Sequence, residues 1–178
     1  MGERGDWVGG EGTRVLVEAA ETRGSDLVIT HFFRVKKNKI RARGHIREAE
    51  VMSRCRFAEY MMEKPANYYY GVMWNKLYRA DLIRTHPDVE CSEELSYSED
   101  FYFNLSFIRY AERFYALSTP VYNYVQNPES LVHNLNPVKV LTTRWELLAY
   151  YKDLYKHLGL YEANKIRLNK YFFGIAES

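Results

Sequence analysis

The chain has 178 residues and a mass of 21.1 kDa, a length typical of one domain with a substantial core. Its composition, 47% hydrophobic and 27% charged residues, excludes a disordered chain. A formal net charge of +2 is too small to indicate nucleic acid or an anionic membrane as a partner on its own.

The cysteines and the apolar segments indicate in which cellular compartment the protein is expected. Cys55 and Cys91 have no CxxC spacing and no nearby histidine pair, so we predict neither a zinc site nor a disulfide framework. No apolar run is long enough to span a bilayer, and the first six residues do not resemble a signal peptide. We therefore expect a cytoplasmic protein, with a peripheral position at the inner face of the membrane as the alternative.

The N-terminal part predicts an α/β unit. Five glycines in the first dozen residues indicate a loop. Residues 13–22 have a helical pattern, and Gly24 is suited to the left-handed position after the helix end. The β-branched and aromatic run 26–33 predicts a strand buried on both faces. A helix leading into a buried strand is the repeating element of α/β folds.

A basic segment follows this strand, with a turn predicted at Lys37-Asn38. Its cations are Arg34, Lys36, Lys37, Lys39, Arg41, Arg43 and Arg47. They could bind phosphate groups of a nucleic acid, a lipid or a nucleotide. More often such a run is the solvated face of an edge hairpin, where lysines also discourage aggregation.

The middle of the chain combines a helical pattern with a stretch rich in aromatic residues. Residues 48–62 predict a helix ended by Pro65, with one face formed by Val51, Cys55, Ala58 and Met62. Residues 68–79 are crowded with aromatic side chains, which are common in cores and also line pockets for ring-shaped polar ligands. A short helix is expected over 80–84.

An acidic pair, Glu99 and Asp100, begins the next apolar helical run, and Ser98 is suited to cap it. Phe101, Leu105 and Ile108 recur at helical spacing, which predicts a buried helix. The helix dipole favours ionised carboxylates in the first turn. An ionised carboxylate on a rigid element can act as a base, but acidic residues are also common there for the dipole alone.

The C-terminal part combines strands and helices. Residues 114–117 and 121–125 predict two short strands broken at Thr119-Pro120, and 127–130 a turn. Asn136 and Pro137 predict the start of a long helix ended by Gly159. Its expected apolar stripe is Val138, Leu141, Trp145, Leu148, Tyr151, Tyr155 and Leu158. A last helix is expected from Tyr161 to Phe173.

Four segments, in this order, resemble family 2 glycosyltransferases, which have the GT-A fold and make bacterial surface polysaccharides. The first is the strand at 26–29 with Phe33-Arg34-Val35 after it. The most specific is Trp74-Asn75-Lys76-Leu77-Tyr78-Arg79, similar to the family's W-N-K-L-Y-R segment. Ser98-Glu99-Asp100 resembles its acidic motif, and residues 120–131 resemble the closing strand and turn. The resemblance covers about residues 7–135.

The resemblance implies an inverting transfer from a nucleotide-sugar donor to a saccharide or lipid-linked acceptor. Asp100 would be the catalytic base and Glu99 its motif neighbour. Trp74 and Lys76 would shape the acceptor side, although Lys76 is equally compatible with a solvated charge.

The resemblance also implies a divalent metal, Mn²⁺ or Mg²⁺, on the departing diphosphate. Asp6-Trp7-Val8 resembles the tail of the family's metal motif, whose ligand positions would fall on Glu3 and Gly5. Asp6 is therefore one metal-site candidate, and His133 is the other, because it lies where some GT-A enzymes place a late metal ligand. Because the family's first nucleotide-binding strands have no counterpart here, we expect an N-terminally truncated catalytic domain.

We therefore predict an α/β fold: the C-terminal part of a GT-A mixed sheet with flanking helices over 1–135, and a helical extension over 136–178. The leading hypothesis is a glycosyltransferase with no nucleic-acid partner. The alternative is an inactive remnant that binds saccharide or self-associates through an exposed sheet edge. A third hypothesis, nucleic-acid binding through the basic segment, would require a steep salt dependence.

Overall fold

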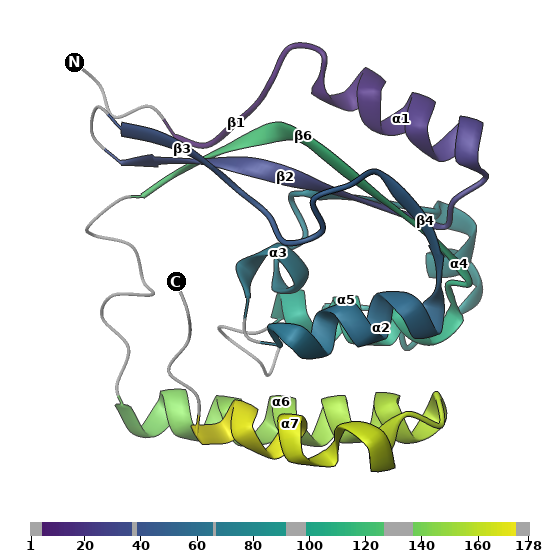
Figure 1. Ribbon diagram of the computed structural model, residues 1–178, viewed down its shortest axis with the longest axis vertical. Helices are drawn as coiled ribbons and strands as arrows, with labels where there is room; N and C mark the ends of the chain where they lie inside the picture. The colour runs from purple at the N-terminus through teal and green to yellow at the C-terminus, as the bar shows by residue number, and fades with distance from the viewer. Residues whose placement is uncertain (1–4, 37–38, 66, 92–98, 127–136, 174–178) are drawn as a thin grey trace. The chain divides into compact units, whose positions relative to one another are not determined.

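The computed structural model describes residues 5–36, 39–65, 67–91, 99–126 and 137–173 (Figure 1). The chain divides into two compact units, each built from separate stretches of sequence. We call Met1–Met52, Trp74–Arg79 and Arg113–Asn134 the sheet unit, and Ser53–Met73, Ala80–Glu112 and Leu135–Ser178 the helical unit. The predicted boundary between 135 and 136 lies outside the described residues and stays a prediction.

The described residues form a six-stranded mixed sheet, which confirms the predicted α/β class. Its strands are β1 (Trp7–Val8), β2 (Leu27–Lys36), β3 (Lys39–Arg43), β4 (Glu50–Ser53), β5 (Lys76–Tyr78) and β6 (Arg113–Val125). The path β1-β6-β2-β3 runs across the sheet, while β4 pairs with β6 and β5 with β2. The β2–β6 pair is parallel, and β1, β3 and β5 are antiparallel to their neighbours.

Helix α1 (Gly12–Arg23) covers one face of this sheet (Figure 1). Leu16 of the helix packs in one apolar cluster with Val28 of β2 and Val121 of β6. The helix ends as predicted at Gly24, whose φ of 57° lies in the left-handed region that glycine adopts without steric cost. Its N–H bonds back to the carbonyls of the last turn, and the chain can turn directly into the buried start of β2.

Strand β2 confirms the predicted buried strand and extends to Lys36, where it forms a hairpin with β3. The predicted turn residues, Lys37 and Asn38, lie outside the described residues. The two strands predicted in the region 114–125 are one continuous strand, β6. Its register shifts between Thr30 and Phe32 of β2, where residues 118–121 oppose a single residue. The bulge accommodates Pro120, which cannot donate to a regular ladder.

The predicted helix over 48–62 is wrong in its first part. Residues 50–53 form β4, and helix α2 (Arg54–Glu63) begins only after Ser53, whose Oγ accepts from the N–H of Arg56 at 3.3 Å. Val51 and Cys55 are exposed instead of lying on a buried face. Pairing of β4 with β6 overrides the helical spacing, and the serine cap marks the real start of the helix.

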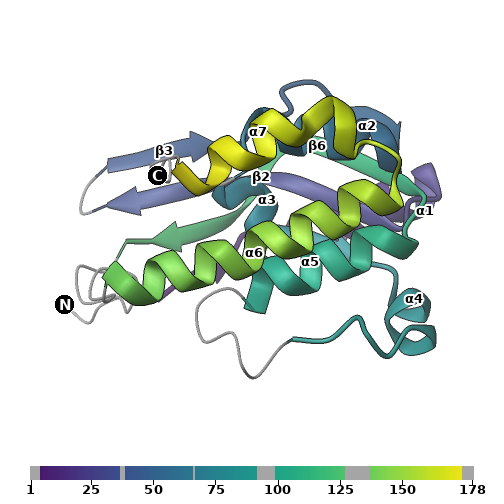
Figure 2. The same cartoon turned by 90° about the horizontal axis from the view of Figure 1, so that it is seen from below.

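The helical unit contains α2, α3 (Tyr68–Gly71), α4 (Ala80–Thr85), α5 (Glu99–Tyr110), α6 (Pro137–His157) and α7 (Tyr161–Phe173). Figure 2 shows α6 lying beside α5 and α7. The predicted helix at the acidic pair is α5, and its residues from Phe103 to Ile108 are buried. The predicted caps Ser98 and Asn136 lie outside the described residues. None of the described helices is both long and apolar enough to cross a membrane.

The stripe predicted for α6 is only partly correct. Leu148, Tyr151 and Tyr155 are buried, and the Tyr151 hydroxyl donates to the carbonyl of Pro65 at 2.8 Å. Trp145, predicted in the same stripe, is 61% exposed. Leu147 and Leu154 are buried with these tyrosines, so the contact face is rotated around the helix relative to the prediction.

The contact between α3 and α5 supplies a stability test. A Cβ on Gly71 would lie 2.0 to 2.6 Å from three ring atoms of Phe101. We expect Gly71→Ala to lower the free energy of unfolding by about 1–3 kcal/mol through overpacking, as measured by urea denaturation. Gly10→Ala, at a position with nothing within 4 Å, is the matched control and should change stability little. Phe101→Leu should restore part of the loss, and equal stability of Gly71→Ala and wild type would contradict this packing.

Candidate functional site

The acidic pair occupies the first turn of α5, where both carboxylates are half-buried. The Oδ2 atom of Asp100 accepts a hydrogen bond of 3.0 Å from the backbone N–H of Met73. This bond joins residues 27 positions apart and gives the carboxylate one orientation. The structure therefore holds Asp100 as an oriented carboxylate at the start of a buried helix.

A buried asparagine also stabilises the first turn of α5. Asn104 is 2% exposed, and its Nδ2 donates to the carbonyls of Gly71 at 2.9 Å and of Asp100 at 2.6 Å. Helix α3, which ends at Gly71, is itself capped by Asn67, whose Oδ1 accepts from the N–H of Tyr69. Sequence reasoning missed this support, although a lone amide within an apolar helical run was a detectable signal.

Glu99, the motif neighbour, has a different environment. Its Oε2 atom is buried and has no hydrogen-bond partner among the described residues. Leaving a buried carboxylate oxygen unpaired costs free energy, so the Oε2 atom of Glu99 keeps unused acceptor capacity. The pair thus offers one oriented carboxylate and one with unused acceptor capacity.

The charges of the acidic pair also affect the thiol of Cys91. Partial burial, followed by the charges of Asp100 and Glu99, raises the pKa of the Cys91 thiol. Its Sγ lies 3.9 Å from the Sδ of Met73. A thiol held protonated beside carboxylates is a poor nucleophile.

The other predicted residues, Trp74 and Lys76, belong to the sheet unit, whereas the acidic pair belongs to the helical unit. The Trp74 ring stacks on Tyr122 and Tyr124, with centroids 4.4 and 5.5 Å apart, and meets Phe32 edge-on at 4.8 Å. These four rings form an aromatic cluster on one face of β2 and β6. Met73, which orients Asp100, immediately precedes Trp74 in the sequence.

Lys76 is not a solvated charge. It is 8% exposed, and its Nζ donates to Oδ1 of the fully buried Asn75 at 2.9 Å. Asn75 in turn donates to the carbonyl of Thr30 at 3.0 Å and accepts at its own carbonyl from the Thr30 hydroxyl at 3.2 Å. The W-N-K-L-Y-R segment therefore joins β2 through a buried polar network. The predicted contact of Trp74 and Lys76 with an acceptor stays a prediction.

The described residues do not supply a complete metal site. They contain no cluster of three His, Cys, Asp or Glu side chains able to hold an ion. Asp6 is exposed, and its carboxylate accepts from the N–H of Val125 at 2.7 Å and from the Tyr122 hydroxyl at 3.2 Å. Glu3 and His133 lie outside the described residues. The described residues therefore do not by themselves hold the implied metal, which stays a prediction.

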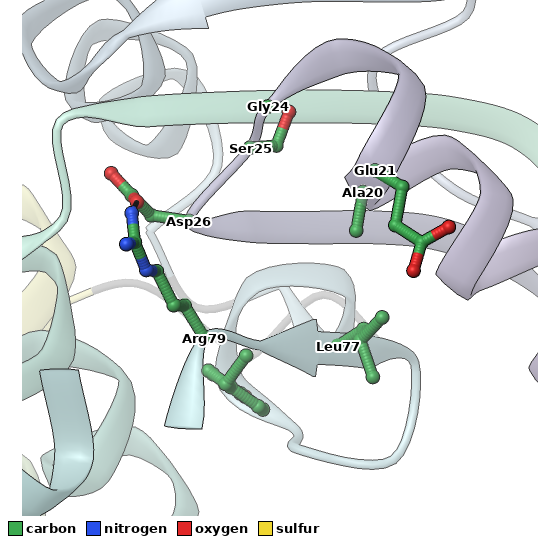
Figure 3. A pocket seen from close by; sticks show the side chains of 8 residues that line it. Ala20, Glu21, Gly24, Ser25, Asp26, Leu77 and Arg79 are labelled. Atoms are coloured by element: carbon green, nitrogen blue, oxygen red, sulfur yellow. Dashed lines mark hydrogen bonds and ion pairs between the residues drawn. The ribbon is translucent and has the colours of Figure 1, made fainter. Parts of the chain in front are cut away.

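A surface pocket of about 300 Å³ lies elsewhere in the sheet unit, between the end of α1, the start of β2 and β5. Figure 3 shows the Arg79 guanidinium reaching the Asp26 carboxylate beside it, at 3.2 Å. Asp26 also accepts from the N–H of Arg113 at 3.1 Å. The pocket contains none of the predicted site residues, and its charged pair already ties β2 to its neighbours. We place the candidate site at Asp100.

Comparison with known proteins gives the same picture of the fold. The chain superimposes on Staphylococcus aureus TarS, residues 1–349, in complex with UDP-GlcNAc, with a TM-score of 0.61, 15% sequence identity, and coverage of 89% of this chain and 46% of that one. The complex of the same protein with UDP gives a TM-score of 0.61 and 17% identity over 95% of this chain and 45% of that one. This chain has a glycosyltransferase fold.

A curated protein resembles the chain in sequence as well. The uncharacterized glycosyltransferase EpsJ of Bacillus subtilis (strain 168) is 27% identical over 169 residues, which cover 93% of this chain and 48% of EpsJ. No family model matches the chain. The predicted resemblance to glycosyltransferases is therefore confirmed, and it extends beyond residues 7–135. The chain spans about half the length of the relatives it matches.

The hydrogen bond between Tyr122 and Asp6 predicts a pH dependence. Burial, then the charge of Asp6 and its hydrogen bond, raise the pKa of Tyr122 to about 12 from 10.0. The folded state therefore holds this proton more tightly, and its stabilising contribution is complete below pH 10 and disappears as the pH rises towards 12. Over this range, we expect stability to fall less steeply in Tyr122→Phe than in wild type, as measured by urea unfolding. Asp6→Asn removes part of the cause of the raised pKa, so its stability should also fall less steeply with pH than that of wild type. Parallel curves of stability against pH for all three proteins would contradict this prediction.

Proposed function

We propose that this chain forms part of a family 2 glycosyltransferase of GT-A type, which transfers a sugar from a nucleotide-sugar to a hydroxyl of a saccharide or lipid-linked acceptor. The observation that carries the proposal is Asp100, oriented by the Met73 N–H at the start of a buried helix in a glycosyltransferase fold. Synthesis of a bacterial surface polysaccharide is the process that the resemblance favours.

The chemistry needs one base. The Asp100 carboxylate takes the proton of the acceptor hydroxyl as that oxygen attacks the anomeric carbon. The bond from this carbon to the nucleoside diphosphate breaks on the opposite face, and its electron pair leaves with the diphosphate. The product therefore has the inverted configuration. The Met73 N–H orients the carboxylate, and Asn104 holds the backbone of the same turn through the carbonyl of Asp100.

The donor class is suggested by the TarS complexes, which contain UDP-GlcNAc and UDP. We therefore take uridine diphosphate sugars as the first donors to test. A divalent ion, Mn²⁺ or Mg²⁺, is part of the same proposal through the family resemblance.

The second candidate function is a non-catalytic module that binds saccharide. The stacked rings of Trp74, Tyr122 and Tyr124 favour it, because sugar rings bind through their apolar faces to aromatic surfaces. In this case the acidic pair would have only a structural role. Substitution of Asp100 distinguishes the two candidates.

Asp100→Asn retains an oxygen that can accept from the Met73 N–H, so the fold should persist while the base is lost. We expect sugar transfer to fall by about 10²–10⁴-fold, measured as product formed from a radiolabelled uridine diphosphate sugar. Asp81→Asn is the matched control, because Asp81 is an exposed acidic residue in the first turn of α4. Undiminished transfer by Asp100→Asn would contradict the proposed base.

A thermal melt of the chain with uridine diphosphate, with Mn²⁺, and with both tests the donor site. If a metal-dependent nucleotide site exists in this chain, both ligands together should raise the Tm more than either alone. Ligand at about 100 times its Kd would stabilise the fold by about 2.7 kcal/mol. A cooperative melt that none of these additions moves would contradict a donor site for this nucleotide in this chain.

A further inference from the structure

The hairpin of β2 and β3 gathers positive charge on one face. Its register places Arg34 opposite Arg41 and Lys36 opposite Lys39, with Arg43 opposite Phe32. Because side chains two residues apart share a face of a strand, all five cations lie on the same side of the hairpin. We call Arg34, Lys36, Lys39, Arg41 and Arg43 the basic face.

This arrangement is unfavourable for the isolated chain. Like charges directly opposite each other on neighbouring strands repel, and the basic face contains two such pairs. None of the five cations forms an ion pair with any described residue. The Nε of Arg34 is buried and has no hydrogen-bond partner among the described residues. An anionic surface would relieve this repulsion.

The charge is also unevenly distributed along the chain. Seven of the 25 Lys and Arg residues lie between positions 34 and 47, and residues 27–47 contain no Asp or Glu. Outside that basic segment, the remaining 18 cations are outnumbered by 23 acidic residues. The small overall charge of +2 therefore conceals a basic hairpin on an otherwise acidic chain.

The same hairpin exposes an apolar side chain. Ile40 is 61% exposed, and alternation places it with Val35 on the side opposite the basic face. Strand β3 ends the path of strands across the sheet (Figure 2). Each of its five residues is exposed. A flat surface approaching this edge would meet Ile40 together with Lys39 and Arg41.

We propose that the β2–β3 hairpin docks edge-on to an anionic lipid surface, with the exposed cations of the basic face, Lys36, Lys39, Arg41 and Arg43, at the headgroups and Ile40 in the interfacial layer. Lipid headgroups attract clustered lysine and arginine, and an apolar side chain adds partitioning. A nucleic acid would satisfy the cations but would gain nothing from Ile40. A second copy pairing through β3 would bring the two sets of cations together.

The test is sedimentation of the intact chain with vesicles of equal parts phosphatidylcholine and phosphatidylglycerol, compared with phosphatidylcholine alone. We expect binding to the anionic vesicles that falls with added salt. Removing two charges in Lys39→Gln/Arg41→Gln should weaken partitioning by about 25-fold, at about fivefold for each cation near the surface. Ile40→Ser should weaken it by about tenfold.

Two matched controls lie on α7. Arg167→Gln/Lys170→Gln removes two exposed cations outside the hairpin, and Ile166→Ser changes an isoleucine that is 67% exposed. Both should bind the anionic vesicles as wild type does. Equal binding to both vesicle types, no binding to either, or binding unaffected by the hairpin variants would overturn the proposal. So would binding to a short DNA duplex that requires Lys39 and Arg41 and outcompetes the vesicles.

The inference goes beyond the proposed sugar transfer and does not depend on it. Vesicle binding is measured without donor or acceptor, and Asp100→Asn should bind vesicles like wild type. A failure of the transfer assay therefore leaves this test intact, and a failure of vesicle binding leaves the assignment of Asp100 intact.

Discussion

The parallel pairing of β2 with β6 is the interaction on which the rest of the sheet unit depends. It joins residues 27–35 to residues 114–125, which are far apart in the sequence. Every other described strand attaches to one of these two: β1 and β4 to β6, and β3 and β5 to β2. A parallel pair requires a long connection between its strands, and here that connection carries the W-N-K-L-Y-R segment and the acidic helix. The candidate functional residues thus lie in the stretch of sequence that connects the two central strands.

Hydrogen bonds between buried polar groups hold each of the two candidate segments in place. In the sheet unit, Asn75 and Thr30 exchange hydrogen bonds and leave the ammonium of Lys76 bonded within the protein. In the helical unit, Asn104 and the Met73 N–H hold the turn that carries Asp100. A buried amide that lost these partners would cost free energy, so each network restricts its segment to one arrangement. Such restriction is what a positioned base or ligand contact needs.

The similarity to TarS and EpsJ agrees with the observed fold. Its low identity and partial coverage limit what the similarity shows about function. Likeness at 15 to 17% identity to the TarS structures concerns architecture, and the chain spans about half of each relative. The proposed chemistry therefore depends on the oriented carboxylate of Asp100. The proposed lipid contact depends separately on the charge and register of the β2–β3 hairpin.

The sequence by itself determined the elements whose signals are local. Glycine after α1, the β-branched start of β2, proline at the first position of α6 and the periodic apolar residues of α5 each act within a few residues, so these elements were predictable. The acidic pair and the aromatic segment were also recognisable, because they are contiguous motifs.

Local signals could not reveal the β4 pairing that replaces the start of a predicted helix, or the burial of Lys76 and the exposure of Trp145. Only the tertiary structure decided these, because strand pairing and burial depend on partners that are distant in the sequence. The same reason explains why the Met73 N–H bond to Asp100 and the shared face of the basic hairpin became visible only in the folded chain.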